Sequence, residues 1–288
     1  MSPDGGVSPQ ALRARIHRYY GGDCRIRAVR STARPGAFLF VLDAVQRGRL
    51  VRTLGTIGRG GGSVMEHSAL DLGRPERLVF NYEREMLVAL AVVARPMSAL
   101  LLGLGGGAMC RHLAAFLPEL RLTVVERDPE VIALARQFFH LEREVLRADA
   151  VEVVADARRA FDVVMVDLYD AAGASPLEDS FWADCRAALR PGGAIAVNWA
   201  GSLQGGLPRA EIEHAMASLP GSFLLIERGP RPNLVQIAPG DPAFRLPGLA
   251  TRFRAFAARH KLPREDRDVL QRAEVTARYP AADKRSRT

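Results

Sequence analysis

The sequence predicts an α/β protein: a doubly wound, mostly parallel seven-stranded sheet with a terminal antiparallel hairpin, preceded by a small N-terminal β-region. Three observations lead to this prediction. Strand-like and helix-like runs alternate between residues 99 and 198, as they do in doubly wound sheets. Residues 99–104 carry no polar side chain, as expected of a parallel strand buried on both faces. Two further strand-like runs, near residue 230, are joined by a Gly/Pro turn and indicate a hairpin at the sheet edge.

The N-terminal part is expected to hold one helix and a small antiparallel β-region. Ser8 followed by Pro9 favours a helix start, because serine can cap a helix and proline suits its first turn. Two strand-like runs, residues 37–43 and 49–54, are separated by a short polar turn and predict the β-region. A glycine-rich turn follows at residues 58–62.

The alternation that defines the main sheet begins near residue 82. The expected elements are a helix at 82–93, a strand at 99–104, a helix ending at 117, a strand at 122–126, a helix at 129–139 capped by Asp128, a short third strand at 144–147, a strand at 162–167, a helix at 180–189, a strand at 194–198 and hairpin strands at 223–227 and 234–238. We expect three parts: an N-terminal helix and small β-domain (1–80), a Rossmann-like domain (81–245) that contains the motifs described below, and a C-terminal helix with a basic tail (246–288).

Composition and cysteine usage exclude several classes of protein. The chain has 288 residues, of which 48% are hydrophobic and 25% charged, as in an ordinary globular protein. No apolar run approaches the roughly 20 residues that a membrane-spanning helix needs, and the N-terminus has no signal-like apolar stretch, so we expect a cytoplasmic protein with no membrane partner. The three cysteines are scattered along the chain, which argues against disulfides and against a metal site.

Charge is unevenly distributed along the chain. The formal net charge is +8, yet residues 97–170 hold 12 acidic residues against 8 arginines. This acidic segment contains the motifs described below, and an acidic centre favours a cationic substrate over phosphate. A nucleic-acid partner is therefore not expected. A non-catalytic nucleoside-binding or nucleic-acid-binding module, using the arginine-rich flanks, is kept as a second alternative function.

A glycine-rich turn marks the start of a predicted nucleoside site. Gly103, Gly105, Gly106 and Gly107 lie where the first buried strand gives way to a helix. Glycine lets a ligand approach the backbone closely, and a helix start offers N–H groups that have no partner within the helix. The GxGxG spacing differs from the GxGxxG of nicotinamide cofactors and favours a nucleoside without a pyrophosphate.

Two carboxylates complete this predicted site. Glu126 ends the second strand, where a carboxylate can accept hydrogen bonds from both ribose hydroxyls. Asp149 follows the third strand, at a position that can meet an adenine amino group. Because all these residues fall at successive predicted strand ends, the sequence predicts a nucleoside site. Methyltransferase-type Rossmann folds use the same glycine spacing, and this resemblance implies S-adenosylmethionine or its decarboxylated form as the bound donor.

Two further carboxylates follow the fourth strand of the main sheet. Asp167 ends that strand and Asp170 follows three residues later, at the carboxyl end of the sheet where ligands bind in this architecture. Such a pair can hold a cationic amine and accept its proton. We therefore expect a small-molecule amine as the second substrate.

Together these motifs resemble the spermidine synthase (polyamine aminopropyltransferase) family, from about residue 38 to residue 238. The matching residues are Leu42-Asp43 with Gln46, Tyr82 with Met86, Gly103–Gly107, Val125-Glu126-Arg127-Asp128-Pro129, Asp149-Ala150, Asp167 with Asp170, and Leu189 with Pro191-Gly192-Gly193. The resemblance implies a methyltransferase-like Rossmann fold and a homodimer formed with help from the N-terminal β-domain. It also implies transfer of an aminopropyl group from decarboxylated S-adenosylmethionine to a diamine, with methylthioadenosine as product.

The resemblance implies roles for the site residues as well. Glu126 would bind the ribose and Asp149 the adenine. Asp167 would be the acid–base residue, with Asp170 and Tyr82 binding the amine. Gln46 would approach the nucleoside or the amine, although it stands one residue closer to Asp43 than is usual in the family.

Two departures from the family pattern bear on the donor. The family's glycine loop contains an aspartate that contacts the aminopropyl amine, and Gly106 stands there in this chain. An Asp-Glu motif of the classical enzymes is replaced by residues 77–80. The expected function is aminopropyl transfer to a polyamine-type amine. The alternative is a small-molecule methyltransferase that uses S-adenosylmethionine, because Gly106 leaves room for the donor's carboxylate and removes a repulsive charge.

Overall fold

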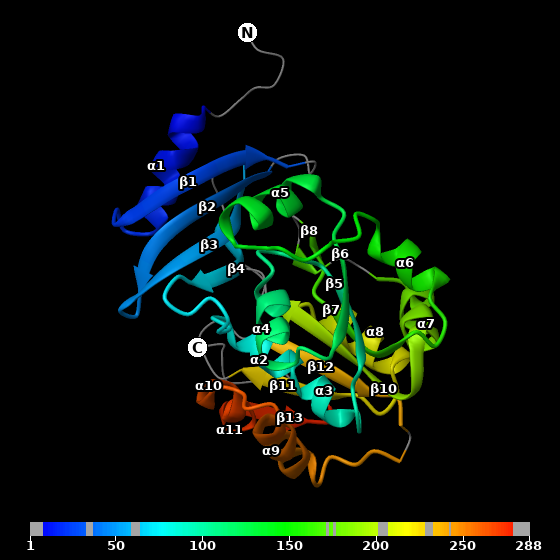
Figure 1. Cartoon of the computed structure of the whole chain (residues 1–288). Helices are drawn as coiled ribbons and strands as arrows, with labels where there is room; N and C mark the ends of the chain where they lie inside the picture. Colours follow the sequence, from blue (N-terminus) through cyan, green and yellow to red (C-terminus); the bar gives the residue numbers. More distant parts are fainter. Residues whose placement is uncertain are drawn as a thin grey trace, which may run out of the picture. The chain divides into compact units, whose positions relative to one another are not determined.

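The structure is a computed structural model that describes residues 8–32, 37–58, 64–170, 173–174, 177–200, 207–227, 233–241 and 243–278. Within these ranges the helices, coloured along the sequence in Figure 1, are α1 (Pro9–Tyr19), α2 (Asn81–Met86), α3 (Val88–Val92), α4 (Ala108–Phe116), α5 (Pro129–Phe138), α6 (Ala150–Asp156), α7 (Asp179–Ala188), α8 (Arg209–Ser218), α9 (Leu249–Arg259), α10 (Arg264–Arg267) and α11 (Val269–Arg272). The strands are β1 (Cys24–Ser31), β2 (Ala37–Gln46), β3 (Arg49–Gly58), β4 (Val64–Asp71), β5 (Ser98–Leu102), β6 (Arg121–Val125), β7 (Phe161–Val166), β8 (Tyr169–Asp170), β9 (Gly173–Ala174), β10 (Leu189–Ala200), β11 (Phe223–Glu227), β12 (Asn233–Pro239) and β13 (Ala273–Thr276).

The described strands form two large sheets and one short ribbon. The N-terminal sheet has the order β1-β2-β3-β4 and is antiparallel throughout. The larger sheet has the order β13-β11-β12-β10-β7-β5-β6, and β8 pairs with β9 in the ribbon. The predicted fold class is therefore confirmed: a seven-stranded, mostly parallel sheet with an antiparallel hairpin follows a small β-sheet.

One strand of the larger sheet differs from the prediction. Residues 144–147, expected to form the third strand, lie within the described range 64–170 and form a single parallel bridge, Val125 to Leu146. Two of their four side chains are charged and Leu146 stays exposed, so longer pairing would bury little apolar surface. The seventh strand of the sheet is instead β13, in which Val275 pairs with Leu225 of β11. The β11–β12 hairpin is present as predicted, but β13 forms the sheet edge beyond it.

The chain forms two compact units. The first comprises Met1–Glu83 and Leu100–Val153, and the second comprises Arg84–Ala99 and Val154–Thr288. The boundaries drawn from the sequence at residues 80 and 245 stay a prediction.

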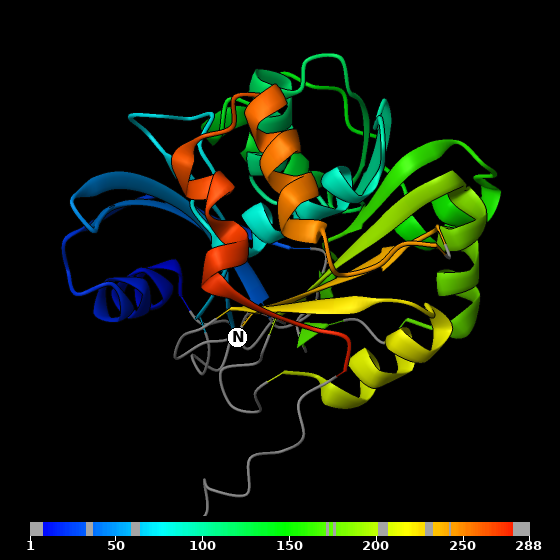
Figure 2. The same ribbon diagram turned by 90° about the horizontal axis from the view of Figure 1, so that it is seen from below.

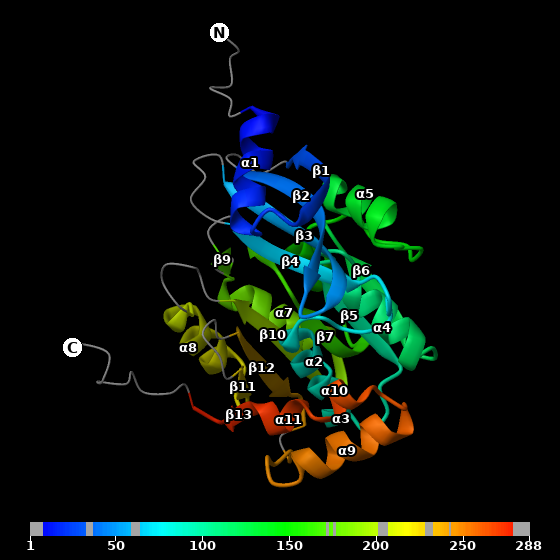
Figure 3. The same ribbon diagram turned by 90° about the vertical axis from the view of Figure 1, so that its left-hand side faces the viewer.

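In the first unit, helices α1 and α5 cover opposite faces of the β1–β4 sheet (Figure 3). Alternate side chains of β2 account for this arrangement. Phe40 and Leu42 pack in the cluster that includes α1, whereas Leu39 and Val41 pack in the cluster that includes α5. Successive side chains of a strand point to opposite faces, so a strand covered on both sides needs a continuous apolar run.

In the second unit, helices lie on both faces of the strands β10–β12, with α3 and α9 on one face and α7 and α8 on the other (Figure 2). This is the doubly wound arrangement that the alternation of elements predicts. The helix expected from residue 246 onward is present as α9 and is followed by α10, α11 and β13.

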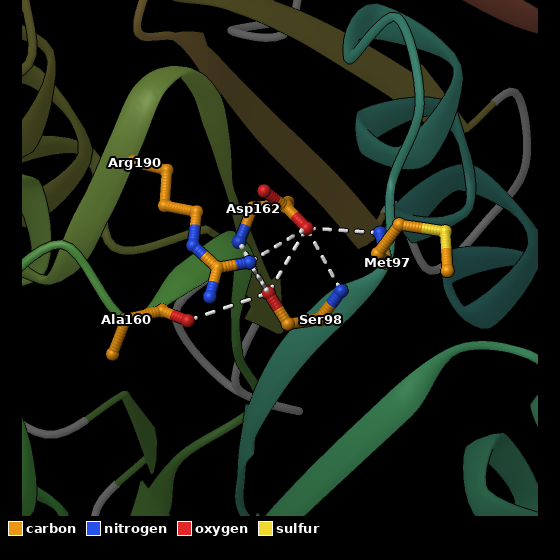
Figure 4. A network of polar contacts seen from close by, with 5 residues as sticks. All are labelled: Met97, Ser98, Ala160, Asp162 and Arg190. Atoms are coloured by element: carbon orange, nitrogen blue, oxygen red, sulfur yellow. Dashed lines mark hydrogen bonds and ion pairs between the residues drawn. The ribbon is translucent and has the colours of Figure 1, made fainter.

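A polar network joins the start of β5 to β7 within the second unit (Figure 4). The Oδ2 atom of Asp162 accepts hydrogen bonds from the Met97 N–H at 2.9 Å, the Ser98 N–H at 2.8 Å and the Ser98 hydroxyl at 2.9 Å. Arg190 donates to the Ser98 hydroxyl at 2.9 Å and lies 3.5 Å from Asp162. Burial acts to raise the pKa of Asp162, but these donors outweigh it and lower the pKa.

Local capping signals located helix starts correctly. The Ser8 and Asp128 side chains accept backbone hydrogen bonds at 3.2 and 2.9 Å and cap α1 and α5. The single helix expected at 82–93 is instead two helices, α2 and α3. The Leu87 N–H bonds to the Arg84 carbonyl at 3.2 Å, an i→i−3 contact that tightens the turn between them.

Two predictions concern residues outside the described ranges: the glycine-rich turn, of which residues 59–62 fall there, and the basic tail beyond residue 280. Among the described helices, none combines the length and apolar character that crossing a membrane requires.

Candidate active site

The loop between β5 and α4 depends on glycine backbone conformations. Gly103, Gly105 and Gly107 have φ angles of 97°, 53° and 73°, in the left-handed region that other residues rarely adopt. The Gly103 N–H donates to the Val125 carbonyl at 2.9 Å, which joins the loop to the end of β6. Gly107 is the N-cap residue of α4, so the first N–H groups of that helix lie at the loop, as the sequence predicts.

Gly106 has no room for a side chain in this loop. A Cβ built on it would lie 2.7 Å from Cδ1 of Phe139 and 3.0 Å from Oγ of Ser68. Both neighbours are buried, Phe139 completely. We expected Gly106 to leave open space for a donor carboxylate, but Phe139 and Ser68 fill the space that a side chain at this position would take. The packing around Gly106 therefore leaves no space for a side chain, a carboxylate included.

Arg111, the fourth residue of α4, donates hydrogen bonds to the glycine loop and to segments next to it. Its Nη1 donates to the carbonyls of Gly106 at 2.6 Å and Phe139 at 2.7 Å, and its Nε donates to the Pro75 carbonyl at 3.3 Å. Desolvation lowers the pKa of Arg111 to about 10, against the opposing effect of Glu83, so the guanidinium is charged at neutral pH. Sequence reasoning missed Arg111. Its signal was a cationic residue in a buried helix directly after the glycine turn.

Glu126 stands at the end of β6, next to the glycine loop. Its Oε2 accepts a hydrogen bond from the Leu104 N–H at 3.2 Å, and its Oε1 accepts one from the Asp128 N–H at 2.9 Å. These two backbone donors orient the carboxylate, which is only partly buried. A carboxylate is acceptor-only when ionised, and the role of Glu126 toward two ribose hydroxyls stays a prediction.

Asp149 lies at the start of α6 and makes two polar contacts. Its Oδ1 accepts a hydrogen bond from the Val151 N–H at 2.9 Å, so it caps the helix start. Its Oδ2 lies 3.4 Å from Nη1 of Arg127, the residue after Glu126. The first unit thus brings the glycine loop, Glu126 and Asp149 into one region, and the assignment of Asp149 to adenine stays a prediction.

Tyr82 contacts the strand that borders the glycine loop. Its hydroxyl donates to the His67 carbonyl at 3.4 Å, and its ring stacks on Phe80 with centroids 5.8 Å apart. Ser68, the residue after His67, packs against Gly105 and Gly106. Tyr82 therefore belongs to the same unit as the loop, and its role as an amine ligand stays a prediction.

Gln46 ends β2, where its Nε2 donates to Oγ1 of Thr53 at 3.5 Å. Asp43 of the same strand is ion-paired with Arg27 and Arg52 at 2.6 Å each. Burial acts to raise the pKa of Asp43, but the two arginines outweigh it and hold the pKa below its usual range. Asp43 therefore stabilises the N-terminal sheet, while the predicted contact of Gln46 with a ligand stays a prediction.

Asp167 directly follows β7 in the second unit, at the position that the sequence predicts. Its Oδ1 accepts a hydrogen bond from Nδ2 of Asn198 at 2.9 Å. Strands β7 and β10 pair in parallel with Val197 opposite Val166, so Asn198 comes level with Asp167. Sequence reasoning missed Asn198, whose signal was a polar residue at the end of an apolar strand. Asp170 belongs to β8, but its side chain lies outside the described residues.

Within the described residues, no group of three or more His, Cys, Asp or Glu side chains could hold a metal ion. The arrangement offers three carboxylate acceptors: Glu126 after β6 and Asp149 before α6 in the first unit, and Asp167 after β7 in the second.

Residues 80–202 match the family of the spermine/spermidine synthase domain. The polyamine aminopropyltransferase of Neisseria meningitidis is 36% identical over 146 residues, which are 48% of this chain and 56% of that protein. The polyamine aminopropyltransferase of Chromobacterium violaceum matches with the same identity and the same coverage. The chain thus spans just over half the length of the curated relatives it matches.

Solved structures show the same fold. A probable spermidine synthase from Corynebacterium glutamicum superposes with a TM-score of 0.64 at 20% identity, over 88% of this chain and 91% of that chain. A spermidine synthase in complex with the transition state analogue AdoDATO gives 0.60 at 18% identity, over 88% and 89%. Human methyltransferase-like protein 13 in complex with SAH gives 0.54 at 23% identity, over 65% and 95%.

The sequence match and the fold agree with each other and with the motifs at the strand ends. Residues 80–202 match the spermine/spermidine synthase domain, and the chain shares its fold with solved spermidine synthase structures.

Proposed function

We propose that this protein transfers an aminopropyl group from a decarboxylated S-adenosylmethionine-type donor to a polyamine-type amine. The observation that carries the proposal is the carboxylate of Glu126, oriented by backbone N–H groups beside the glycine loop of a spermine/spermidine synthase domain. The relatives that match over the longest stretches include polyamine aminopropyltransferases, and one solved structure with this fold is a spermidine synthase in complex with AdoDATO.

The donor would be held by its nucleoside part. Glu126 would accept hydrogen bonds from the two ribose hydroxyls, and Asp149 would accept one from the adenine amino group. Glycines 103, 105 and 107 would let the backbone approach the donor closely, because glycine has no side chain of its own. These contacts bind the part of the donor that does not react, and so they position the reacting carbon.

Asp167 would act on the acceptor. An amine attacks only as the neutral base, and a carboxylate oriented by Asn198 can take its proton. A carbon–nitrogen bond then forms at the carbon beside the sulfonium while the carbon–sulfur bond breaks. The bonding pair returns to sulfur, so the positive charge disappears from it and methylthioadenosine leaves. Most of the acceleration would come from positioning and from exclusion of water.

A methyltransferase that uses S-adenosylmethionine is the second candidate, and one observation favours it. The glycine loop has no carboxylate at Gly106, and the packing of Phe139 excludes one. A donor that carries its own carboxylate therefore meets no like charge from this position, so Gly106 does not select the decarboxylated donor.

Calorimetry with decarboxylated S-adenosylmethionine, S-adenosylmethionine and methylthioadenosine in parallel tests the donor site. Glu126→Ala should weaken binding of all three by at least about a hundredfold, because two charge-assisted hydrogen bonds of roughly 1.5–3 kcal/mol each are lost. The matched control is Glu144→Ala, which removes an exposed carboxylate from the same unit and should leave affinity unchanged. Unchanged affinity in a folded Glu126→Ala protein would remove the ribose assignment.

A further inference from the structure

Arg127, in the first unit, lies where it could contact the donor's base directly. It follows Glu126 at the end of β6, and its Nη1 lies 3.4 Å from Oδ2 of Asp149. Both side chains are substantially exposed, at 55% for Arg127 and 39% for Asp149. Exposed ion pairs of this kind are worth about 0–1 kcal/mol, so a ligand can replace either partner at little cost.

The backbone fixes where this pair lies. The Leu146 N–H donates to the Val124 carbonyl at 2.8 Å, and the Glu126 N–H donates to the Leu146 carbonyl at 3.1 Å. The chain that leads to Asp149 therefore runs beside the end of β6. A nucleoside with its ribose on Glu126 and its amino group on Asp149 must place its base between these two carboxylates, and the side chain of Arg127 spans that interval.

Apolar surface is also exposed in this region. Leu146 and Val151, three residues before and two residues after Asp149, are 49% and 46% exposed. A flat, partly apolar ligand can cover these two apolar side chains and at the same time donate a hydrogen bond to the neighbouring carboxylate. A purine carrying an amino group has both properties.

We propose that Arg127 recognises the face of the purine ring, with its guanidinium stacked on the base while Asp149 reads the base's amino group. The inference deepens the proposed function and rests on it, because it takes the ligand to be an adenine nucleoside. On binding, Asp149 exchanges the guanidinium for the amino group, and Arg127 gains a cation–π contact with the ring. The planar guanidinium suits this stacking, whereas a lysine ammonium offers only a point charge.

The test is calorimetry with methylthioadenosine on four variants of the whole chain. Arg127→Ala should weaken binding about 3- to 30-fold. Arg127→Phe should restore affinity to within about threefold of wild type, because an aromatic ring also stacks on a base, whereas Arg127→Lys should recover only part of the loss. The matched control, Arg121→Ala, removes an exposed arginine at the other end of the same strand and should leave affinity unchanged. Thermal unfolding confirms that each variant is folded.

Binding of a second ligand distinguishes two roles of Arg127: stacking on the base, and orienting the Asp149 carboxylate. Methylthioinosine carries a carbonyl where methylthioadenosine carries the amino group. If Arg127 stacks, Arg127→Ala weakens both ligands by the same factor. If Arg127 only orients Asp149, the loss is confined to methylthioadenosine, and the proposal is overturned. It is also overturned if Arg127→Ala binds as wild type does, or if lysine restores affinity fully and phenylalanine does not.

Failure of the inference can be told from failure of the proposed function. Wild-type protein that binds no methylthioadenosine contradicts both. Wild-type binding that is lost in Glu126→Ala and unchanged in Arg127→Ala leaves the donor site in place and contradicts only the role of Arg127.

Discussion

Replacing Gly106 with alanine adds one methyl group at a loop position that the packing already fills. The new carbon would lie 2.7 Å from Cδ1 and 3.0 Å from Cε1 of Phe139, and 3.0 Å from Oγ of Ser68. Carbon atoms in contact are normally about 3.5–4.0 Å apart, so the ring or the loop must move by about 0.8 Å or more. The ring cannot move freely, because Phe139 is fully buried in the cluster beneath the N-terminal sheet.

The expected cost follows from overpacking. An extra methylene in a packed core costs typically about 1–3 kcal/mol, and the stiffer unfolded chain of an alanine variant offsets about 0.4–1 kcal/mol of it. We therefore expect a net destabilisation of about 1–2 kcal/mol, which corresponds to a fall in Tm of about 2–8 °C for a chain of this size. Movement of the loop should also disturb the 2.6 Å bond from Arg111 to the Gly106 carbonyl and weaken nucleoside binding.

Urea unfolding and thermal unfolding measure the effect. The matched control is Gly58→Ala, because a Cβ at Gly58 would meet nothing within 4 Å and its φ is not positive, so that variant should be neutral or slightly stabilised. Adding Phe139→Leu to Gly106→Ala should give a double variant that loses less than the sum of the single losses. Full stability in Gly106→Ala, or simple additivity in the double variant, would refute the packing explanation for the missing loop carboxylate.

Three further predictions concern the acceptor, acid stability and assembly. Asp167→Asn should abolish turnover while methylthioadenosine affinity stays within about threefold, because the residue would act on the amine; turnover that survives removes Asp167 as the base. Asp162→Asn should lower stability by about 1–3 kcal/mol at pH 7. The pKa of Asp162 is lowered in the folded state, so its contribution is complete above the unfolded pKa of about 3.9 and is lost as pH falls through the folded pKa; a wild-type advantage that persists undiminished at pH 2–3 would contradict this. We predict a homodimer formed through residues 25–60. Lysine at both Val45 and Leu50, an exposed cross-strand pair, should give monomers in light scattering, and a wild-type monomer at micromolar concentration would argue against the dimer.

The elements that sequence reasoning located are those whose burial pattern is local. The run 99–104 identified a strand buried on both faces, and strand-like runs placed Glu126 and Asp167 at strand ends, where the structure has them. Asp149 was placed after a third strand that is a single bridge in the structure, and it instead precedes α6. By contrast, strand β1 was missed because a bulge between Ile26 and Ala28 breaks its alternation of polar and apolar residues.

Residues whose roles depend on distant partners could not be predicted. The link of Asn198 to Asp167 follows from the parallel register of β10 on β7, which connects residues 31 positions apart. A side chain at Gly106 is excluded by Phe139, a residue that follows β6 and α5 in the sequence. In the same way, the hydrogen bond from Arg111 to the Gly106 carbonyl could be identified only from the structure.

The proposal that this chain transfers an aminopropyl group is tested most directly by identifying the product. The protein is incubated with a mixture of diamines and polyamines and either decarboxylated S-adenosylmethionine or S-adenosylmethionine, and the products are analysed by mass spectrometry. We predict an aminopropylated amine and methylthioadenosine with the decarboxylated donor, and competitive binding of S-adenosylmethionine within about a hundredfold, because the loop carries no carboxylate at Gly106. A methylated amine formed from S-adenosylmethionine, with no aminopropylated product from the decarboxylated donor, would contradict the proposal.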